Sequence, residues 1–291
     1  MKLLFEFTSA VRRKLTALRK LLSFVRRLST YGMAVGYFKI ISTEECELQM
    51  RRTRAFHIGS RQLLTDFKFD VEVEGLINIE DATRNYLIVS NHLSYMDPIV
   101  IASCVPTQFV TSVDMGESVF LGDLCRLGGC LFIERRNRSR VERDLSQISG
   151  ALKARRNVTL FPEGTSSNGQ TVLPFKKSLL MAAVEANVDI LPIAISYVKI
   201  DHRPVNDLNR DQICWYGDMS FAPHFIDLLS VSAVKVKIQF LNPIKVSAES
   251  SRDELAAAAY KQIHAAFRQT QTHRVEGDYH AQSPDLQFVG P

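Results

Sequence analysis

The sequence lacks long apolar runs and paired cysteines, and its first thirty residues contain only one acidic side chain. No stretch approaches the roughly 20 apolar residues that a bilayer-spanning helix needs. The N-terminus also lacks the continuous apolar core and small-residue cleavage site of a secretory signal. These absences favour a cytosolic protein that at most rests on a membrane surface.

The cysteines exclude the common structural metal sites. None of them forms a CxxC pair or has a histidine at zinc-ligand spacing. Their number is odd and they fall in apolar runs, which favours buried thiols in a reducing compartment. The five residues are Cys46, Cys104, Cys125, Cys130 and Cys214.

The composition is that of a folded globular protein with a sizeable hydrophobic core. The chain has 291 residues, 46% apolar and 23% charged, which are ordinary values for a globular protein. From residue 67 onward, short apolar strands alternate with amphipathic helices. This alternation predicts an α/β fold, a mixed and mostly parallel sheet flanked by helices. The main expected strands are 69–75, 86–90, 107–113, 128–133, 157–161, 190–197 and 234–240, and the helices 139–155, 177–187 and 253–270.

Residues 1–30 have the pattern of a basic amphipathic helix. Basic side chains repeat every seven residues, and Glu6 is the single acidic residue in the segment. Apolar residues at spacings of three and four form one stripe of such a helix. The stripe consists of Leu4, Phe7, Val11, Leu15, Leu18, Leu22, Val25 and Leu28, and the basic repeat of Arg12, Arg13, Arg19, Lys20, Arg26 and Arg27.

Three uses of this helix remain open. An anionic membrane surface would accept the apolar stripe and attract the basic residues, and we favour this use. The helix could instead pack on the protein's own body. A nucleic-acid arm is the third possibility, but it would leave the apolar stripe unused. We therefore predict a membrane-docking segment over 1–66, in which a second helix turns back, followed by a domain over 67–271 and a flexible tail over 272–291.

The first constellation with chemical potential is His92 with Asp97, between a buried strand and a helix. A histidine with an ordinary pKa suits a general base that takes a proton from an alcohol. A carboxylate can fix the imidazole tautomer and stabilise the imidazolium. The alternative is that Asp97, which precedes Pro98, caps a helix and that His92 is a loop residue.

Two further segments could bind an anion. In Leu160-Phe161-Pro162-Glu163-Gly164-Thr165, a strand enters a turn whose backbone N–H groups could hold a phosphate, with Lys176 and Lys177 close behind. In Gly129-Cys130-Leu131-Phe132-Ile133-Glu134-Arg135, a strand ends at a guanidinium that could bind a phosphate with two hydrogen bonds. Each alone is equally compatible with an ordinary turn or a solvated basic face.

Together, in this order, the segments resemble the glycerolipid acyltransferase family, of the 1-acylglycerol-3-phosphate acyltransferase type. The family pattern Asn-His-x4-Asp is matched by Asn91, His92 and Asp97, and Phe-Pro-Glu-Gly-Thr by 161–165. The resemblance covers roughly residues 70–245. The remaining matches are Gly129, Phe132, Ile133 and Arg135 in the second block and 190–194 in the fourth.

The resemblance implies a membrane-associated O-acyltransferase of phospholipid biosynthesis. It would move a fatty acyl group from acyl-CoA or acyl-carrier protein to a lysolipid hydroxyl, with no cofactor and no metal. His92 would be the general base and Asp97 its partner. The enzyme would sit peripherally on the cytoplasmic face of the cell membrane, bound to anionic lipid through residues 1–30. The expected acceptor-binding residues are Phe132, Arg135, Glu163, Gly164, Thr165 and Lys176.

One departure from the family pattern bears on the acceptor. Many members that use lysophosphatidate carry an arginine directly after Glu-Gly-Thr, where this chain has Ser166. The first expectation is 1-acylglycerol-3-phosphate, giving phosphatidate. The missing cation makes lyso-ornithine lipid or another lysophospholipid a rival acceptor. A lipid-binding protein without catalysis is the alternative from another class.

Overall fold

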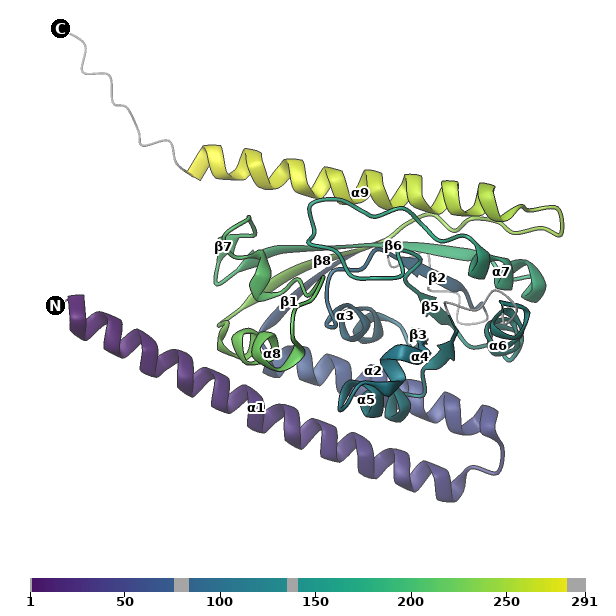
Figure 1. The fold of residues 1–291 in the computed structure, drawn as a ribbon, viewed down its shortest axis with the longest axis horizontal. Coiled ribbons are helices and arrows are strands. Elements are labelled where there is room, and N and C mark those ends of the chain that lie inside the picture. The colour runs from purple at the N-terminus through teal and green to yellow at the C-terminus, as the bar shows by residue number, and fades with distance from the viewer. Residues whose placement is uncertain (1, 76–83, 135–140, 282–291) are drawn as a thin grey trace, which may run out of the picture.

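The centre of the molecule is one eight-stranded sheet (Figure 1). The structure, a computed structural model, describes residues 2–75, 84–134 and 141–281. The strand order is β1-β8-β6-β2-β5-β3-β4, with β7 paired to β6. The strands are β1 (Phe69–Glu74), β2 (Leu87–Ser90), β3 (Gln108–Ser112), β4 (Leu131–Ile133), β5 (Val158–Leu160), β6 (Ile190–Ile200), β7 (Arg203–Pro204) and β8 (Val234–Phe240).

All strand pairs are parallel except β6 with β8 and β6 with β7, which are antiparallel. This arrangement confirms the predicted mixed, mostly parallel α/β sheet. The central strand β2 is fully buried, and Leu87, Ile88 and Val89 are all 0% exposed. Continuous apolar runs are what strands covered on both faces require.

Helices cover both faces of the sheet. The long helix α9 (Arg252–Ala281) lies along one face, while α3 (Asp97–Cys104) and the hairpin of α1 (Lys2–Ile41) and α2 (Glu45–Asp66) lie on the other (Figure 1). The remaining helices are α4 (Val113–Glu117), α5 (Leu121–Gly128), α6 (Val141–Lys153), α7 (Met181–Ala186) and α8 (Phe221–Ser230), with 3-10 turns at Ser178–Leu180 and Arg210–Gln212.

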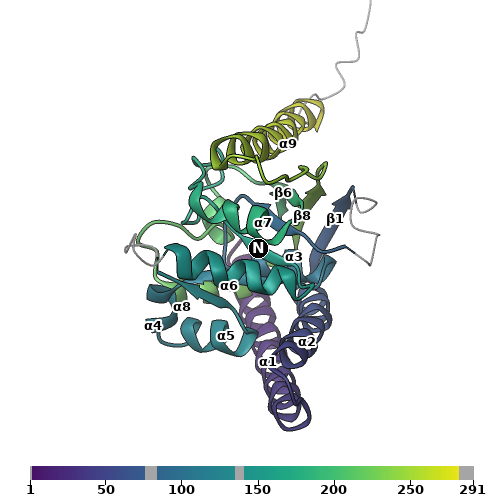
Figure 2. The same ribbon diagram turned by 90° about the vertical axis from the view of Figure 1, so that its right-hand side faces the viewer.

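Helix α1 is longer than the sequence pattern indicates, and α2 returns beside it as expected (Figure 2). Two basic residues of α1 face the body of the protein. Lys20 is 4% exposed, and its Nζ donates to the carbonyl oxygen of Val231. Arg27 Nε donates to Asp66 Oδ2 at 2.8 Å. The helix therefore packs on the body through part of its basic stripe.

The opposite side of α1 is apolar and uncovered. Its exposed side chains recur at spacings of three and four along the helix, which places them on one face. Among the described residues, no helix is long and apolar enough to cross a membrane. The exposed face consists of Val11, Leu15, Leu18, Leu22 and Val25.

Several predicted boundaries differ from the structure, and two of them concern the elements α5 and α9. The strand expected over 128–133 begins at Leu131, because α5 continues to Gly128 and is capped by Gly129, whose φ of +72° suits a glycine. Helix α9 continues to Ala281, so the first part of the predicted tail is helical. The rest of that tail, 282–291, lies outside the described residues.

Candidate functional site

The site lies where two neighbouring parallel strands end. β2 pairs with β5 in parallel, so the loops that follow them leave the same edge of the sheet. The first loop carries His92 and the second carries Glu163. Ser167 N donates to the carbonyl oxygen of His92 at 2.9 Å, and His92 N donates to Glu163 Oε1 at 2.7 Å. Topology thus joins two segments that are distant in sequence.

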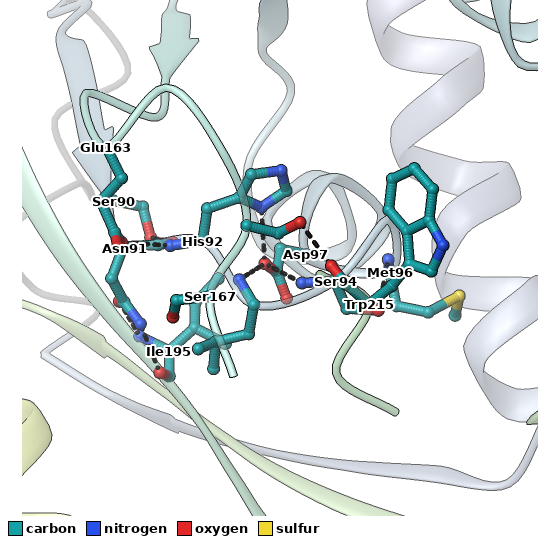
Figure 3. Close-up of polar contacts among 12 residues, drawn as sticks. Ser90, Asn91, His92, Ser94, Met96, Asp97, Glu163, Ser167, Ile195 and Trp215 are labelled. Atoms are coloured by element: carbon teal, nitrogen blue, oxygen red, sulfur yellow. Dashed lines mark hydrogen bonds and ion pairs between the residues drawn. The ribbon is translucent and has the colours of Figure 1, made fainter. Parts of the chain in front are cut away.

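His92 and Asp97 form a hydrogen-bonded pair (Figure 3). His92 Nδ1 lies 2.8 Å from Asp97 Oδ2, and Asp97 is 0% exposed. Since an ionised carboxylate only accepts hydrogen bonds, Nδ1 carries the proton and Nε2 keeps its lone pair. The pairing predicted from sequence is therefore present.

Asp97 does not serve as a helix cap. It is the first residue of α3, and the cap residue is Met96, which makes no side-chain cap bond. Asp97 Oδ2 instead accepts from the backbone N–H groups of Leu93, at 2.6 Å, and Ser94, at 2.9 Å. These bonds curl the loop around the carboxylate and orient it toward His92.

The His92 side chain faces a cavity of about 450 Å³. Its ring stacks on Phe161 with 4.1 Å between ring centroids, and the side chain is 21% exposed. Side chains in or next to α1, α2, α3, α5 and α8 make most of the wall apolar, a lining that suits a hydrocarbon chain. They include Phe24, Phe56, Leu63, Met96, Leu124, Phe221 and Phe225.

The predicted acceptor-binding residues occupy different places. Gly164, Thr165 and Lys176 line the cavity together with His92. The Lys176 side chain lies over Gly164, whose φ is +73°, and an added β-carbon there would come within 2.5 Å of Nζ. Phe132 packs on Gly116 and is not among the described cavity-lining residues. Arg135 lies outside the described residues.

Glu163 ties the two loops together. Its Oε1 accepts from His92 N, and its Oε2 accepts from Leu173 N at 2.8 Å. Burial raises the pKa of this carboxyl to about 8, although the two backbone donors lower it. Glu163 is not among the described residues that line the cavity, so its expected contact with the acceptor stays a prediction.

Ser166, the residue that departs from the family pattern, is bonded to a third segment. Its hydroxyl donates to the carbonyl oxygen of Trp215, and Trp215 N donates to the carbonyl oxygen of Leu93 at 2.9 Å. Trp215 and Tyr216 both line the cavity. Residues 215–217 therefore close the cavity beside the His92 loop, a feature that no local sequence signal indicated.

Sequence reasoning also missed Tyr197, whose hydroxyl donates to Asp97 Oδ1 at 2.6 Å. Within an apolar strand it reads as a core residue. Within the described part of the chain, no group of three or more His, Cys, Asp or Glu side chains could hold a metal ion.

Comparison with known proteins gives three findings. Residues 70–196 match the family model described as Acyltransferase. The chain is 31% identical over 189 residues to lyso-ornithine lipid O-acyltransferase of Brucella abortus (strain 2308), covering 62% of this chain and 71% of that protein. It is 26% identical over 159 residues to 1-acyl-sn-glycerol-3-phosphate acyltransferase of Neisseria gonorrhoeae, covering 53% of this chain and 58% of that protein.

A solved structure shares the fold. The 1-acyl-sn-glycerophosphate (LPA) acyltransferase PlsC from Thermotoga maritima superposes with a TM-score of 0.66 at 22% identity. The superposition covers 90% of this chain and 98% of that one. On these matches, the chain belongs to the acyltransferase family whose members acylate lysolipids.

Proposed function

We propose that this protein transfers a fatty acyl group from a thioester to the hydroxyl of a lysolipid, with His92 as the general base. The observation that carries the proposal is the hydrogen bond from His92 Nδ1 to the buried Asp97 carboxylate. That bond leaves Nε2 as the nitrogen with a free lone pair, beside a cavity that suits an acyl chain.

The proposed reaction is a direct transfer. His92 Nε2 takes the proton of the acceptor hydroxyl as its oxygen attacks the thioester carbonyl carbon. Asp97 stabilises the imidazolium that forms. The tetrahedral intermediate collapses with cleavage of the carbon–sulfur bond, and the departing thiolate takes the proton from His92. The acceptor supplies the nucleophilic oxygen, so the mechanism needs no enzyme serine, metal or cofactor. The donor is acyl-CoA or acyl-carrier protein.

We propose a lyso-ornithine type lipid as the preferred acceptor. A phosphomonoester is best held by several cations, and position 166 offers a hydroxyl that is already bonded to Trp215. Lys176 supplies one cation at the cavity, which matches the single carboxylate of an ornithine headgroup. The longer match to a lyso-ornithine lipid O-acyltransferase supports the same choice. Lysophosphatidate, the first expectation from sequence, is the second candidate.

The exposed apolar face of α1 supports docking on a lipid surface. Its side chains could enter the headgroup layer, while the exposed Arg12, Arg13 and Arg19 remain available to lipid phosphates. A lysolipid would then reach the cavity from the membrane on which the enzyme rests. We place that contact on the cytoplasmic face, where anionic lipid attracts basic side chains.

The acceptor is tested with purified protein, labelled acyl-CoA or acyl-carrier protein, and vesicles carrying either lyso-ornithine lipid or lysophosphatidate. We expect a higher kcat/KM for lyso-ornithine lipid. Ser166→Arg should raise the relative rate with lysophosphatidate by about tenfold or more, because a new charged hydrogen bond is worth about 1.5–3 kcal/mol. Ser166→Ala is the matched control and should not favour lysophosphatidate.

The outcomes separate the candidates. A wild-type preference for lysophosphatidate would overturn the proposed acceptor and leave the acyl-transfer chemistry intact. Vesicle binding without turnover on either acceptor, with either donor, would instead support a lipid-binding protein without catalysis. Full wild-type turnover in a folded His92→Ala protein would refute the assigned mechanism.

A further inference from the structure

The second oxygen of the Asp97 carboxylate has its own donor. Oδ2 accepts from His92 and from two backbone N–H groups, whereas Oδ1 accepts from the hydroxyl of Tyr197 at 2.6 Å. Both residues are buried, with Tyr197 only 1% exposed. A buried carboxylate depends on such donors, because no water replaces them when one is lost.

The sheet is built so that this hydroxyl reaches Asp97. β6 continues past the end of β2, whose last residue, Ser90, pairs with Ile193. The Asn91 side chain continues this contact with two hydrogen bonds of 2.9 Å to the backbone of Ile195 (Figure 3). Its amide nitrogen donates to the carbonyl oxygen of Ile195, and its amide oxygen accepts from the N–H of Ile195. Tyr197 follows two residues later and so projects from the same face of the strand as Ile195.

A local irregularity also marks this position. The pairing of β6 with β8 shifts register between Tyr197 and Lys199. Such bulges bend a strand and redirect side chains, and they are frequent beside active sites. The strand thus changes its regular course at the residue whose hydroxyl meets Asp97.

The phenol acts as a donor at every working pH. Burial and the negative charge of Asp97 raise the pKa of Tyr197 well above its usual value, so the hydroxyl keeps its proton. The hydroxyl of Tyr197, the carboxylate of Asp97 and the ring of His92 are therefore joined by two hydrogen bonds in series.

We propose that Tyr197 is a positioning residue for acyl transfer, which holds the Asp97 carboxylate in the orientation and charge state that His92 requires. The inference rests on the proposed function, since it assigns a role to a residue behind the general base. Tyr197 acts through Asp97 and needs no contact with substrate. An ordinary core tyrosine would fill the same volume without affecting the proton affinity of His92.

Tyr197→Phe tests the proposal because it removes the hydroxyl and keeps the ring. We expect kcat to fall by about 10- to 100-fold, as for the loss of a hydrogen bond to a charged group, with KM changed by less than about threefold. Tyr260→Phe is the matched control. Its hydroxyl donates to the carbonyl oxygen of Val172 at 3.3 Å, away from the cavity, and activity should be unchanged.

A second readout does not depend on turnover. Without the Tyr197 donor, more of the Asp97 charge acts on the imidazole. The NMR titration of His92 should therefore move to higher pH by roughly half a unit to one unit, and the acid limb of the rate profile should move with it. Following the His92 signals separates this shift from titration of Glu163, which accepts from His92 N, and of Cys214, whose charge also acts on Tyr197.

A double-mutant cycle decides whether Tyr197 acts through Asp97. In an Asp97→Asn background, Tyr197→Phe should cost less than about twofold, because the carboxylate it serves is gone. If the fold losses in kcat of Tyr197→Phe and Asp97→Asn multiply in the double variant, the inference is overturned. It is also overturned if the His92 titration in Tyr197→Phe matches that of wild type, even where the variant has lower thermal stability. If His92→Ala is inactive while Tyr197→Phe behaves as wild type, the inference fails and the proposed function stands.

Discussion

Replacing Asp97 with asparagine removes the charge behind His92 and keeps the shape of the side chain. Three donors converge on Oδ2, so the single amide oxygen should take that place and the amide nitrogen should face the Tyr197 hydroxyl. The Nδ1–H tautomer of His92 is then preserved. What is lost is the attraction between a carboxylate and the imidazolium formed during the reaction.

The size of the loss follows from the geometry. Unit charges about 4 Å apart attract by about 4 kcal/mol at an effective dielectric constant of 20. The hydrogen bond to the amide oxygen retains about 1 kcal/mol. A net loss of about 3 kcal/mol corresponds to a roughly 100-fold fall in kcat.

Steady-state acyl transfer to the preferred lysolipid measures this loss. Asp70→Asn, at an exposed position on the edge strand β1, provides the matched control and should keep wild-type rates. Circular dichroism and thermal unfolding should show that Asp97→Asn folds. A folded Asp97→Asn enzyme that loses less than about threefold in kcat would refute the charge argument.

Further predictions address the neighbouring features. The folded-state pKa of Glu163 is raised to about 8 from 4.5, so the folded protein holds this proton more tightly than the unfolded chain. The free energy of unfolding, measured by urea titration, should therefore fall as the pH rises between these two values. The fall should be smaller in Glu163→Gln, which has no carboxyl group at this position. Leu22→Glu should weaken sedimentation with anionic vesicles, whereas Lys20→Met should leave it unchanged because the ammonium faces Val231; equal weakening by both would contradict the assigned orientation of α1. Gly164→Ala should destabilise the protein by about 1–2 kcal/mol, because a residue with a β-carbon is strained at the φ of +73° that Gly164 adopts. An unchanged thermal unfolding temperature would contradict this prediction.

The His92–Asp97 pair could be predicted because it is local. Both residues lie in one strand–loop–helix segment, and the chemistry of an imidazole beside a carboxylate is recognisable without coordinates. The meeting of this loop with Glu163 was not predicted, and it arises because the parallel pairing of β2 with β5 brings the loops that follow them to the same edge of the sheet. The fold class was predictable for the same reason, because apolar strands and amphipathic helices alternate along the chain.

Tyr197 could not be predicted, because its role depends on strand register. It stands in the apolar run of β6, where a tyrosine reads as core, and meets Asp97 only because β6 runs past β2. The position of Trp215 against Ser166 likewise depends on a long-range loop contact.

The orientation of α1 was only partly predictable. The amphipathic pattern gives the apolar stripe, and its members from Val11 to Val25 are exposed. It does not reveal that Lys20 and Arg27 hold the helix on the body, because their partners are Val231, directly after α8, and Asp66 in α2. Periodicity along a helix carries no information about what covers each face.

The most direct test of the central claim is acyl transfer by His92→Ala. Labelled acyl chain is followed from the thioester to the lysolipid, with protein folding checked by circular dichroism. Wild type should form labelled diacyl lipid, and His92→Ala should be at least about 100-fold slower, as for removal of a general base. Full activity in a folded His92→Ala protein would contradict the assignment of His92 as the base.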